Sequence, residues 1–274
     1  LLNLLFDISK ESIYISNTIF WELTPYIDVS DQIYKDFYIC IRKRFVKKLN
    51  RNVHVSFSKI YDFTNVLVDI VNKSEHINVD IHKYLTKING HFKLPISIKK
   101  EYVTILTNKI KVIESKTKPV MIPCINIDTT TDLYIIKKED IRKENIIMNI
   151  IKLMNHLLIK YEKLDLNIVT YNILPVSSKC GFIECVKNSH TLYGIREEQL
   201  FSIQNFIMEK NPTITAGELR ENFTKSCAAY CIITYLLGIG DRHLDNIMVT
   251  DKGFIFNIDF GYVLGKDPKL MAPE

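Results

Sequence analysis

Residues 238–250 read GIGDRHLDNIMVT, and residues 258–261, after a short predicted hairpin, read IDFG. Asp241 stands five residues before Asn246, and Asp259 opens an Asp-Phe-Gly triplet. Two strands joined by a tight turn bring the residues that flank them back to the same end of the ribbon. Carboxylate and amide oxygens are ligands that Mg²⁺ accepts in proteins. We therefore predict that Asn246 and Asp259 hold Mg²⁺ or Mn²⁺.

The same stretch contains groups suited to phosphoryl transfer. Transfer from ATP to a hydroxyl needs metal ions that neutralise the phosphates and a group beside the attacking hydroxyl. Protein kinases supply these with a catalytic-loop Asp, an Asn five residues later and the Asp of Asp-Phe-Gly. His243 adds an imidazole, which changes charge near neutral pH. Asp241 and His243 are the predicted catalytic residues, and which of them takes the hydroxyl proton stays open.

The order Asp-Arg-His, in place of His-Arg-Asp, resembles the phosphatidylinositol 3-kinase family. GIGDRHLDNIMVT and IDFGYVLGKDPK are similar to its catalytic and activation loops almost throughout, although Asn257 stands where the family commonly has His. The resemblance is strong over residues 100–274 and weaker at residues 19–23, IFWEL, which resemble the end of the family's helical domain. It implies an α+β, bilobal, protein-kinase-like fold that uses ATP and is preceded by an all-α helical-repeat domain.

The distribution of Gly, Pro and apolar residues along the sequence also indicates a helical part followed by a kinase-like part. Residues 1–90 have almost no Gly or Pro and carry apolar pairs three and four apart, which is typical of helices. Short β-rich runs separated by polar turns follow, and then helices again. We expect a helical accessory domain at 1–90, a kinase N-lobe at 91–186 and a C-lobe at 187–274. Because the chain stops inside the activation segment, we expect an incomplete C-lobe.

The resemblance also implies the residues that hold the phosphates. The segment ESKTKP, residues 114–119, is similar to the family's phosphate-binding loop. Lys137 matches the ATP-contacting lysine at the end of a strand, and Glu144 stands where the family has Asp. The alternative interpretation of residues 114–119 is a charged turn that is simply exposed to solvent and binds nothing. The residues that would contact the β- and γ-phosphates from the loop are Ser115, Lys116 and Lys118.

A further segment, GFIECV at residues 181–186, resembles the family's hinge between lobes. There, two backbone positions would bond the adenine edge, apolar side chains would lie under the ring, and a tyrosine would lie behind it. Ordinary core packing is the alternative for the apolar positions. The residues implied are Glu184 and Val186, Met248 and Ile258, and Tyr171. Together the motifs predict one cleft lined by Ser115, Lys137, Val186, Asn246 and Asp259.

The activation segment bears on which lipid is used. Family members that act on polyphosphorylated inositides carry two basic clusters there, because added phosphates need cationic partners. Residues 261–269, GYVLGKDPK, offer only Lys266 and Lys269, with Asp267 between them. This resembles the class III enzymes and implies unphosphorylated phosphatidylinositol in a membrane surface as the acceptor. The resemblance further implies a regulatory subunit and roles in membrane trafficking and autophagy at endosomes or other internal membranes.

Composition limits the other classes. The net charge of +5 permits an anionic partner but does not demand nucleic acid, and we expect none. The six cysteines form no Cys-x-x-Cys pair, so zinc is not expected, and dispersed cysteines indicate reduced thiols in the cytoplasm. The longest apolar stretch, residues 228–240, is too short to span a bilayer, so we expect a soluble protein that meets membranes from one side.

A basic run lies at residues 42–51, with six Lys or Arg and no acidic residue. It is interpreted as a solvated helix face or as a surface that rests on anionic lipid. Three alternatives to a phosphatidylinositol 3-kinase remain open. They are a phosphatidylinositol 4-kinase, a related protein kinase and a non-catalytic scaffold with the kinase shape.

Overall fold

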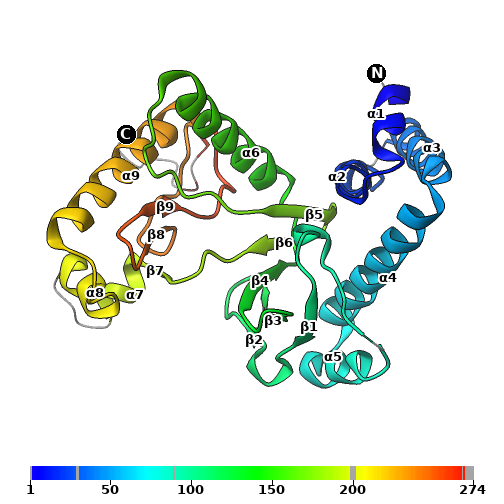
Figure 1. Cartoon of the computed structure of the whole chain (residues 1–274), viewed down its shortest axis with the longest axis horizontal. Coiled ribbons are helices and arrows are strands. Elements are labelled where there is room, and N and C mark those ends of the chain that lie inside the picture. The colour runs from blue at the N-terminus through cyan, green and yellow to red at the C-terminus, as the bar shows by residue number, and fades with distance from the viewer. Residues whose placement is uncertain (1, 29–30, 89, 198–201, 267, 269–274) are drawn as a thin grey trace. The chain divides into compact units, whose positions relative to one another are not determined.

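The computed structural model describes residues 2–28, 31–88, 90–197, 202–266 and 268 (Figure 1). The chain divides into two compact units. The first consists of Leu1–Asn145 and Asn172–Cys185, and the second of Ile146–Tyr171 and Val186–Glu274. Both combine helices with β-sheet, which confirms the predicted α+β class. The helical-repeat domain and the predicted domain boundaries stay predictions.

Helices open the first unit, drawn from blue to cyan in Figure 1. Ser12 and Asp31 cap two of them, because their side chains accept hydrogen bonds from backbone N–H groups of the first turn. Pro25 lies in the first turn of a short 3₁₀ helix that follows the second. The elements are α1 (Leu2–Ser9), α2 (Ile13–Leu23), η1 (Thr24–Tyr26), α3 (Gln32–Lys48), α4 (Arg51–Lys73), α5 (Ile77–Leu85), η2 (Pro95–Ser97) and η3 (Thr107–Lys109).

These helices share one hydrophobic core with the sheet that follows them. Trp21 is almost fully buried, and its Nε1 donates to the Asn17 Oδ1 at 3.1 Å. The Asn17 Nδ2 in turn donates to the Pro95 carbonyl at 2.8 Å. Because each buried polar group has a partner, the contact fixes α2 against the start of the sheet region without an unsatisfied group.

The sheet of the first unit is antiparallel and has the order β1-β3-β4-β6-β5, with β2 paired to β3. Its strands are β1 (Tyr102–Ile105), β2 (Lys111–Val112), β3 (Val120–Asn126), β4 (Thr131–Lys137), β5 (Ile173–Ser177) and β6 (Cys180–Glu184). Strand β4 alternates between buried and more exposed positions, as a strand with one face on a core does. This alternation places Ile136 inside and Lys137 on the other face.

A buried acidic residue anchors β4. Asp132 is 3% exposed, and its Oδ2 accepts from the Lys100 Nζ at 2.7 Å and the Asn126 Nδ2 at 2.9 Å. The Tyr102 hydroxyl donates to the same oxygen at 3.2 Å. A buried carboxylate is tolerated only when hydrogen-bond donors and a cation contact it, as they do here. The network holds the register of the strand that ends at Lys137.

The second unit contains a smaller sheet, β7-β8-β9, and the remaining helices. Helix α6 begins in the first unit and continues into the second. The elements are α6 (Arg142–Leu157), η4 (Leu158–Glu162), β7 (Ser189–Thr191), α7 (Leu192–Glu197), α8 (Ile203–Lys210), α9 (Ala216–Leu237), β8 (Ile247–Thr250) and β9 (Ile255–Asn257).

Helix α9 leads directly into the quoted motif. Gly238 caps it with a φ of 51°, the left-handed conformation that glycine adopts without steric cost at the end of a helix. A Cβ at Gly238 would lie 2.6 Å from the Gly265 nitrogen, so the close backbone approach also requires glycine. The Leu264 N–H donates to the Leu237 carbonyl at 2.9 Å. The segment after Asp-Phe-Gly therefore runs along the end of α9 and the loop that follows.

The predicted hairpin is present as β8 and β9, with Met248 paired to Phe256. Beyond its open end, the Ile258 N–H donates to the Asn246 carbonyl at 3.0 Å. The β-rich run at residues 168–174, IVTYNIL, predicts a strand over its whole length. This prediction is wrong in its extent, because β5 begins only at Ile173, where pairing with β6 begins.

Candidate active site

One arginine side chain holds the catalytic-loop segment in place. The Arg242 Nε donates to the Gly240 carbonyl at 2.8 Å. Its Nη1 donates to the carbonyl oxygens of Asn246 at 3.2 Å and Ile258 at 2.8 Å. Its Nη2 donates to the Asp259 carbonyl at 2.5 Å. A single guanidinium thus ties the loop to the start of the Asp-Phe-Gly triplet.

The chemistry of Arg242 suits this task. Burial lowers the pKa of its guanidinium, while the carboxylates of Asp259 and Asp241 act in the opposite direction. A planar fork of five N–H donors can reach several carbonyls at once, whereas a lysine ammonium cannot match that geometry. The sequence alone did not predict a role for Arg242. The feature that could have indicated one is its position between Asp241 and His243, the two predicted catalytic residues.

The side chain of Asn246 connects both predicted catalytic residues. Asn246 is 8% exposed, and its Nδ2 donates to the Asp241 carbonyl at 2.9 Å. The same Nδ2 lies 3.1 Å from the His243 Nε2. The Asn246 N–H also donates to the His243 carbonyl at 2.9 Å. The turn from Asp241 to Asn246 is therefore closed by its own side chains and backbone.

The imidazole of His243 lies between two carboxylates. Its Nε2 is 4.0 Å from the Asp241 Oδ2, and its Nδ1 is 3.9 Å from the Asp245 Oδ2. The Asp245 N–H lies 3.3 Å from the Nδ1. The imidazole side chain is 51% exposed, so solvent and a substrate can reach it. An exposed imidazole of this kind can take part in proton transfer to or from a substrate.

Two predicted site residues have an unusual backbone conformation. Asp241 has a φ of 56° and Asp259 a φ of 58°. Asp is one of the residue types that tolerate this left-handed region, because its short polar side chain can hydrogen-bond locally. The Arg242 hydrogen bonds to neighbouring carbonyls restrain the backbone here.

The predicted apolar residues of the second unit lie on or beside the hairpin. Met248 is in β8 and Ile258 follows β9, and both are partly exposed. Tyr171 is 4% exposed, and its hydroxyl donates to the Asn257 carbonyl at 3.4 Å. Its ring lies 6.3 Å from that of Phe256, edge to face. Tyr171 therefore packs on β9, whereas Met248 and Ile258 leave part of their surface open to a ligand.

In the first unit, the structure brings Lys137 and Glu144 together. The Lys137 Nζ lies 2.9 Å from the Glu144 Oε1 and 3.3 Å from the Glu139 Oε1. The Lys137 side chain is 14% exposed and that of Glu144 is 6% exposed. A lysine on a strand paired to a glutamate on the following helix is also the arrangement that protein kinases require. Lys137, at the end of β4, is thus held by the start of α6.

A glycine on β6 allows this arrangement. Gly181 pairs with Lys137 in the sheet. A Cβ at Gly181 would lie 2.3 Å from the Ile141 Cδ1 and 2.7 Å from the Leu174 carbonyl oxygen. Any larger residue would push away Ile141, which immediately precedes α6 and is fully buried. The sequence predicted Gly181 as part of the hinge but did not reveal that the absence of a side chain there makes room for Ile141.

The predicted phosphate-binding loop joins β2 to β3. The Lys118 N–H donates to the Ser115 carbonyl at 3.2 Å, and Lys118 has a φ of 45°. The loop closes where the Ile113 N–H donates to the Pro119 carbonyl at 2.8 Å. Ser115, Lys116 and Lys118 are exposed. Both lysine ammonium groups can therefore reach an anion in solvent.

The predicted hinge, residues 181–186, covers the end of β6 and the two residues after it. The Glu184 N–H donates to the Asn172 carbonyl at 2.8 Å. The Val186 carbonyl accepts from the Ser189 Oγ at 2.8 Å, while its N–H has no backbone partner within the described residues. That N–H can donate to the edge of a planar base. Between them, burial raises the pKa of the Cys185 thiol to about 12, so this thiol stays neutral.

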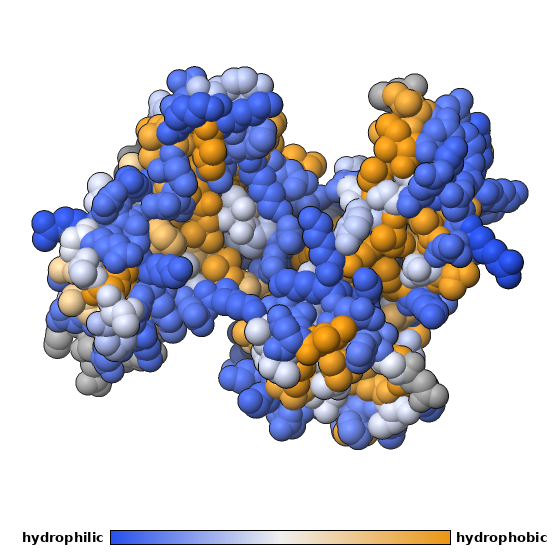
Figure 2. All heavy atoms as spheres, in the orientation of Figure 1, coloured by the Kyte–Doolittle hydropathy of each residue, from blue (hydrophilic) through white to orange (hydrophobic). Residues whose placement is uncertain are grey.

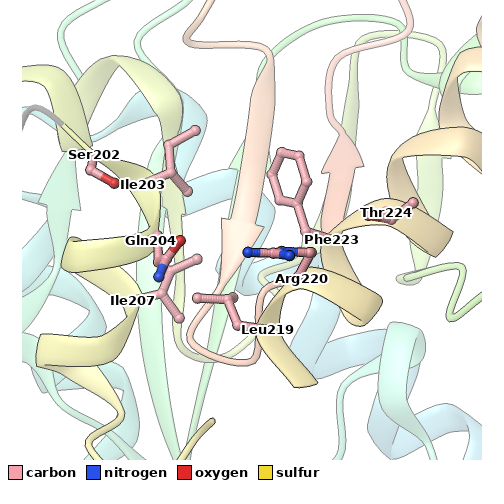
Figure 3. A pocket seen from close by; sticks show the side chains of 8 residues that line it. All are labelled: Ser202, Ile203, Gln204, Ile207, Leu219, Arg220, Phe223 and Thr224. Carbon is pink, nitrogen blue, oxygen red and sulfur yellow. The ribbon is translucent and has the colours of Figure 1, made fainter. Parts of the chain in front are cut away.

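A hollow of about 380 Å³ lies elsewhere in the second unit (Figure 3). It is formed by the facing sides of α8 and α9, with Ile203, Ile207 and Phe223 as apolar walls and Arg220 beside them. None of the predicted site residues lines it. The assignments of Asp241, His243, Asn246, Asp259 and the ATP-contacting residues rest on the local geometry above, and the single cleft stays a prediction. Asp267 and Lys269 lie outside the described residues.

Comparison with known proteins now places the chain in a class. The sequence profile described as phosphatidylinositol 3- and 4-kinase matches residues 131–274, which is more than half of the chain. The chain therefore belongs to the phosphatidylinositol 3- and 4-kinase family, a family of kinases whose domain it carries. This confirms the family resemblance that the catalytic and activation loops carried.

Several phosphatidylinositol 3-kinases are similar to the chain in sequence. The chain is 31% identical over 286 residues to the phosphatidylinositol 3-kinase pik3 of Schizosaccharomyces pombe, covering 94% of the chain and 35% of that protein. It is 44% identical over 139 residues to the phosphatidylinositol 3-kinase VPS34 of Saccharomyces cerevisiae, covering 49% of the chain and 16% of that protein. For VPS34 of Candida glabrata the identity is 30%, over 94% of the chain and 30% of the relative. The chain thus spans about a third or less of these proteins.

Proposed function

We propose that the protein transfers the γ-phosphoryl group of ATP to the 3-hydroxyl of phosphatidylinositol, giving phosphatidylinositol 3-phosphate. The observation that carries the proposal is the Arg242 side chain, which joins the Asp241–Asn246 loop to the Ile258 and Asp259 backbone. It holds the proposed base and the proposed metal ligands in one assembly. The family membership and the phosphatidylinositol 3-kinase relatives support the same reaction.

The proposed step breaks the bond between the γ-phosphorus and its bridging oxygen and forms a bond from that phosphorus to the inositol oxygen. The hydroxyl proton goes to His243 or to Asp241, whose Oδ2 lies 4.0 Å from the His243 Nε2. A positioned acid or base of this kind contributes about 10²–10⁴-fold to a rate. The displaced electron pair stays on the β-phosphate of ADP.

The residues present fit a hard divalent cation. Asn246 offers an amide oxygen and Asp259 a carboxylate, and the Ile258 N–H bond to the Asn246 carbonyl keeps the two segments adjacent. Mg²⁺ commonly binds through one or two protein ligands, with water and substrate phosphates completing its shell. Bound there, Mg²⁺ or Mn²⁺ would neutralise charge on the ATP phosphates.

The first unit supplies the remaining ATP-contacting groups of the proposal. Lys137, oriented by Glu144, and the exposed Ser115, Lys116 and Lys118 would bind phosphate oxygens. Positive charge next to developing phosphate charge is what stabilises such transition states. The Val186 N–H and a backbone group of Glu184 would bond the adenine, with Met248 and Ile258 under the ring and Tyr171 behind.

The choice of lipid rests on the segment after Asp-Phe-Gly. Among its described residues, Lys266 is the one basic side chain, and Tyr262 and Leu264 are exposed at 41% and 77%. Few cations leave additional inositol phosphates without partners, so we propose unphosphorylated phosphatidylinositol as the acceptor. We extend the proposal to a peripheral enzyme of endosomal or other internal membranes that works with a regulatory subunit. Among the described helices, none has the length and apolar character needed to cross a bilayer.

Two other functions remain as competing outcomes. The family description covers 4-kinases as well as 3-kinases, so transfer to the 4-hydroxyl is the second candidate. A non-catalytic scaffold with the kinase shape is the third. The position of the phosphate on the lipid product distinguishes a 3-kinase from a 4-kinase. Any turnover of ATP to a phosphorylated lipid distinguishes both kinases from a non-catalytic scaffold.

The test uses the protein expressed from its complete reading frame. It is given labelled ATP, Mg²⁺ or Mn²⁺, and vesicles containing either phosphatidylinositol or its 4,5-bisphosphate, and the 3- and 4-phosphate products are separated by chromatography. We expect phosphatidylinositol 3-phosphate as the main product and no turnover in Asp259→Asn, which removes the carboxylate charge but tolerates the left-handed backbone of Asp259 and should therefore melt normally. Preference for the bisphosphate, a 4-phosphate product, or full activity of Asp259→Asn would contradict the proposal.

A further inference from the structure

Helix α3 of the first unit has one face in the core and one face in solvent. Ile41 and Phe45 are 7% and 0% exposed, and the Phe45 ring lies 5.4 Å from that of Phe6 on α1. Arg42 also turns toward the core, with its guanidinium 5.2 Å from the Phe20 ring centre. The packing fixes which side of α3 faces outward. The outward side carries exposed apolar and basic residues that are not part of the hydrophobic core.

The N-terminal half of this face is apolar. Ile33 is 78% exposed and Phe37, one turn further along, is 52% exposed. Tyr34 beside them is 59% exposed, and Cys40 continues the row at the next turn. Single exposed apolar residues are normal, but a row of neighbours at helical spacing marks a contact surface.

The C-terminal half of the same face is basic. Lys43, Arg44 and Lys47 are exposed, and no carboxylate within the described residues forms an ion pair with them. Lys48 lies 4.0 Å from Asp7 of α1. Figure 2 shows hydrophilic residues gathered over α3, beside an apolar strip over α1. The unpaired cations repel one another and favour an anionic partner.

Both halves form a single stripe. Residues 33, 37, 40, 44 and 47 are four and three positions apart in turn, which places them on one side of a helix. The one acidic residue of α3 is Asp36, whose Oδ1 accepts from the Gln32 Nε2 at 2.8 Å. At 1.5 Å per residue the helix is about 25 Å long, so the stripe presents an extended apolar and cationic row.

We propose that this α3 stripe is a docking surface for an anionic lipid bilayer. Charge complementarity selects the partner, because the unpaired Arg44 and Lys47 lie in line with exposed Ile33 and Phe37, and the unpaired Lys43 lies beside that row. An interfacial helix buries its apolar row at the level of the headgroups while basic residues contact anionic lipid, at about 1 kcal/mol for each Lys or Arg. The proposal concerns binding alone and stands apart from the phosphoryl transfer proposed above.

The experiment measures sedimentation of the protein with vesicles of phosphatidylcholine, with or without phosphatidylserine, in the absence of ATP and of phosphatidylinositol. Variant Lys43→Glu/Arg44→Glu/Lys47→Glu removes the basic row. Its matched control, Lys59→Glu/Lys87→Glu/Lys111→Glu, makes the same change in net charge at exposed lysines of the first unit. A second variant, Ile33→Ser/Phe37→Ser, removes the apolar row. Circular dichroism verifies that each variant is folded.

We expect binding to phosphatidylserine vesicles that weakens as salt increases. The basic-row variant should lose about 100-fold in affinity, since three contacts of about 1 kcal/mol are removed. The control should retain most of its affinity, and the apolar-row variant should fall well below wild type. Equal binding to pure phosphatidylcholine, equal loss in the control, or full binding by both stripe variants overturns the proposal. Self-association through Ile33 and Phe37 without vesicle binding would also overturn it, in favour of a second copy as the partner.

Discussion

At the level of single residues, the Asn246 side chain contacts both Asp241 and His243 and so joins the three residues at the centre of the site. Neutral imidazole has one acceptor nitrogen, yet both His243 nitrogens lie near N–H donors, from Asp245 and Asn246. Only one of these contacts can be a hydrogen bond to a lone pair in a given tautomer. The other nitrogen then carries the proton, and the carboxylate oxygens nearest to the ring, 4.0 Å away on Asp241 and 3.9 Å away on Asp245, lie beyond hydrogen-bond distance of it.

The first prediction concerns His243. Replacement of His243 by Ala removes the imidazole that faces the proposed hydroxyl, so kcat should fall by about 10²–10⁴, the usual range for a positioned acid or base. ATP binding should be largely retained, because Lys137 and Glu144 are untouched. Steady-state kinetics and nucleotide titration measure the two effects. His190→Ala, at a histidine paired with Asp251 at 2.9 Å, is the control. Normal turnover of His243→Ala would show that the assignment is wrong.

At the level of elements, the guanidinium of Arg242 connects its own loop to Ile258, the residue that follows the β8–β9 hairpin. The β8–β9 pairing already brings Asn246 and Ile258 together, and Arg242 adds the restraint that holds Asp259 in its left-handed conformation. Backbone carbonyls offer no sequence signal of such a contact. The side chain of Arg242 therefore acts on the reaction through the residues that it positions.

The second prediction tests this positioning role. Arg242→Lys keeps the charge but loses the planar fork, leaving some of the carbonyls at Gly240, Asn246, Ile258 and Asp259 without a donor. Each lost bond to a charged group costs about 1.5–3 kcal/mol at most, so we expect a lower melting temperature and a larger relative loss in kcat than in ATP affinity. Arg220→Lys, at an exposed arginine of α9, is the control. A variant that loses stability but keeps wild-type kcat and its metal dependence would show that the role is only structural.

At the level of the whole molecule, burial of thiols links stability to pH. Burial raises the pKa of Cys180 from 9.0 to about 11 and that of Cys185 to about 12. Burial also raises the pKa of the Cys124 thiol and of the Tyr102 hydroxyl. In each case the folded state disfavours the ionised form, so the unfolded chain releases protons first as the pH rises.

The third prediction follows from this sign. For the thiols of Cys124, Cys180 and Cys185, whose unfolded pKa is 9.0, the contribution to stability is fully present below about pH 9 and is lost as the pH rises through the folded values. For Tyr102, whose unfolded pKa is 10.0, the loss begins at a correspondingly higher pH. The melting temperature should therefore fall above pH 9. Each group contributes at most about 1.4 kcal/mol per pH unit. Cys180→Ala should flatten this decline between pH 9 and 11, whereas Cys40→Ala, at an exposed cysteine, should not. Equal slopes for both variants and wild type would contradict the prediction.

Much of the candidate site could be predicted because its signals are local. The Asp241–Asn246 spacing, the hairpin before Asp259 and the glycine cap at Gly238 each depend on residues close along the chain. Turn chemistry, helix caps and strand alternation act over a few residues, so they can be inferred from sequence alone. The family assignment rests on the same continuous segments.

Other features depended on contacts that a linear pattern does not encode. The five donors of Arg242 could have pointed to solvent, and the space beside Gly181 is known only once Ile141 packs there. Strand β5 begins at Ile173, later than the β-rich run indicates, because a strand exists only where a neighbouring edge pairs with it. The basic run of α3 could likewise not be placed on a face until Phe45 was seen in the core. Side-chain direction is chosen by long-range packing, which is why these residues emerged only from the folded chain.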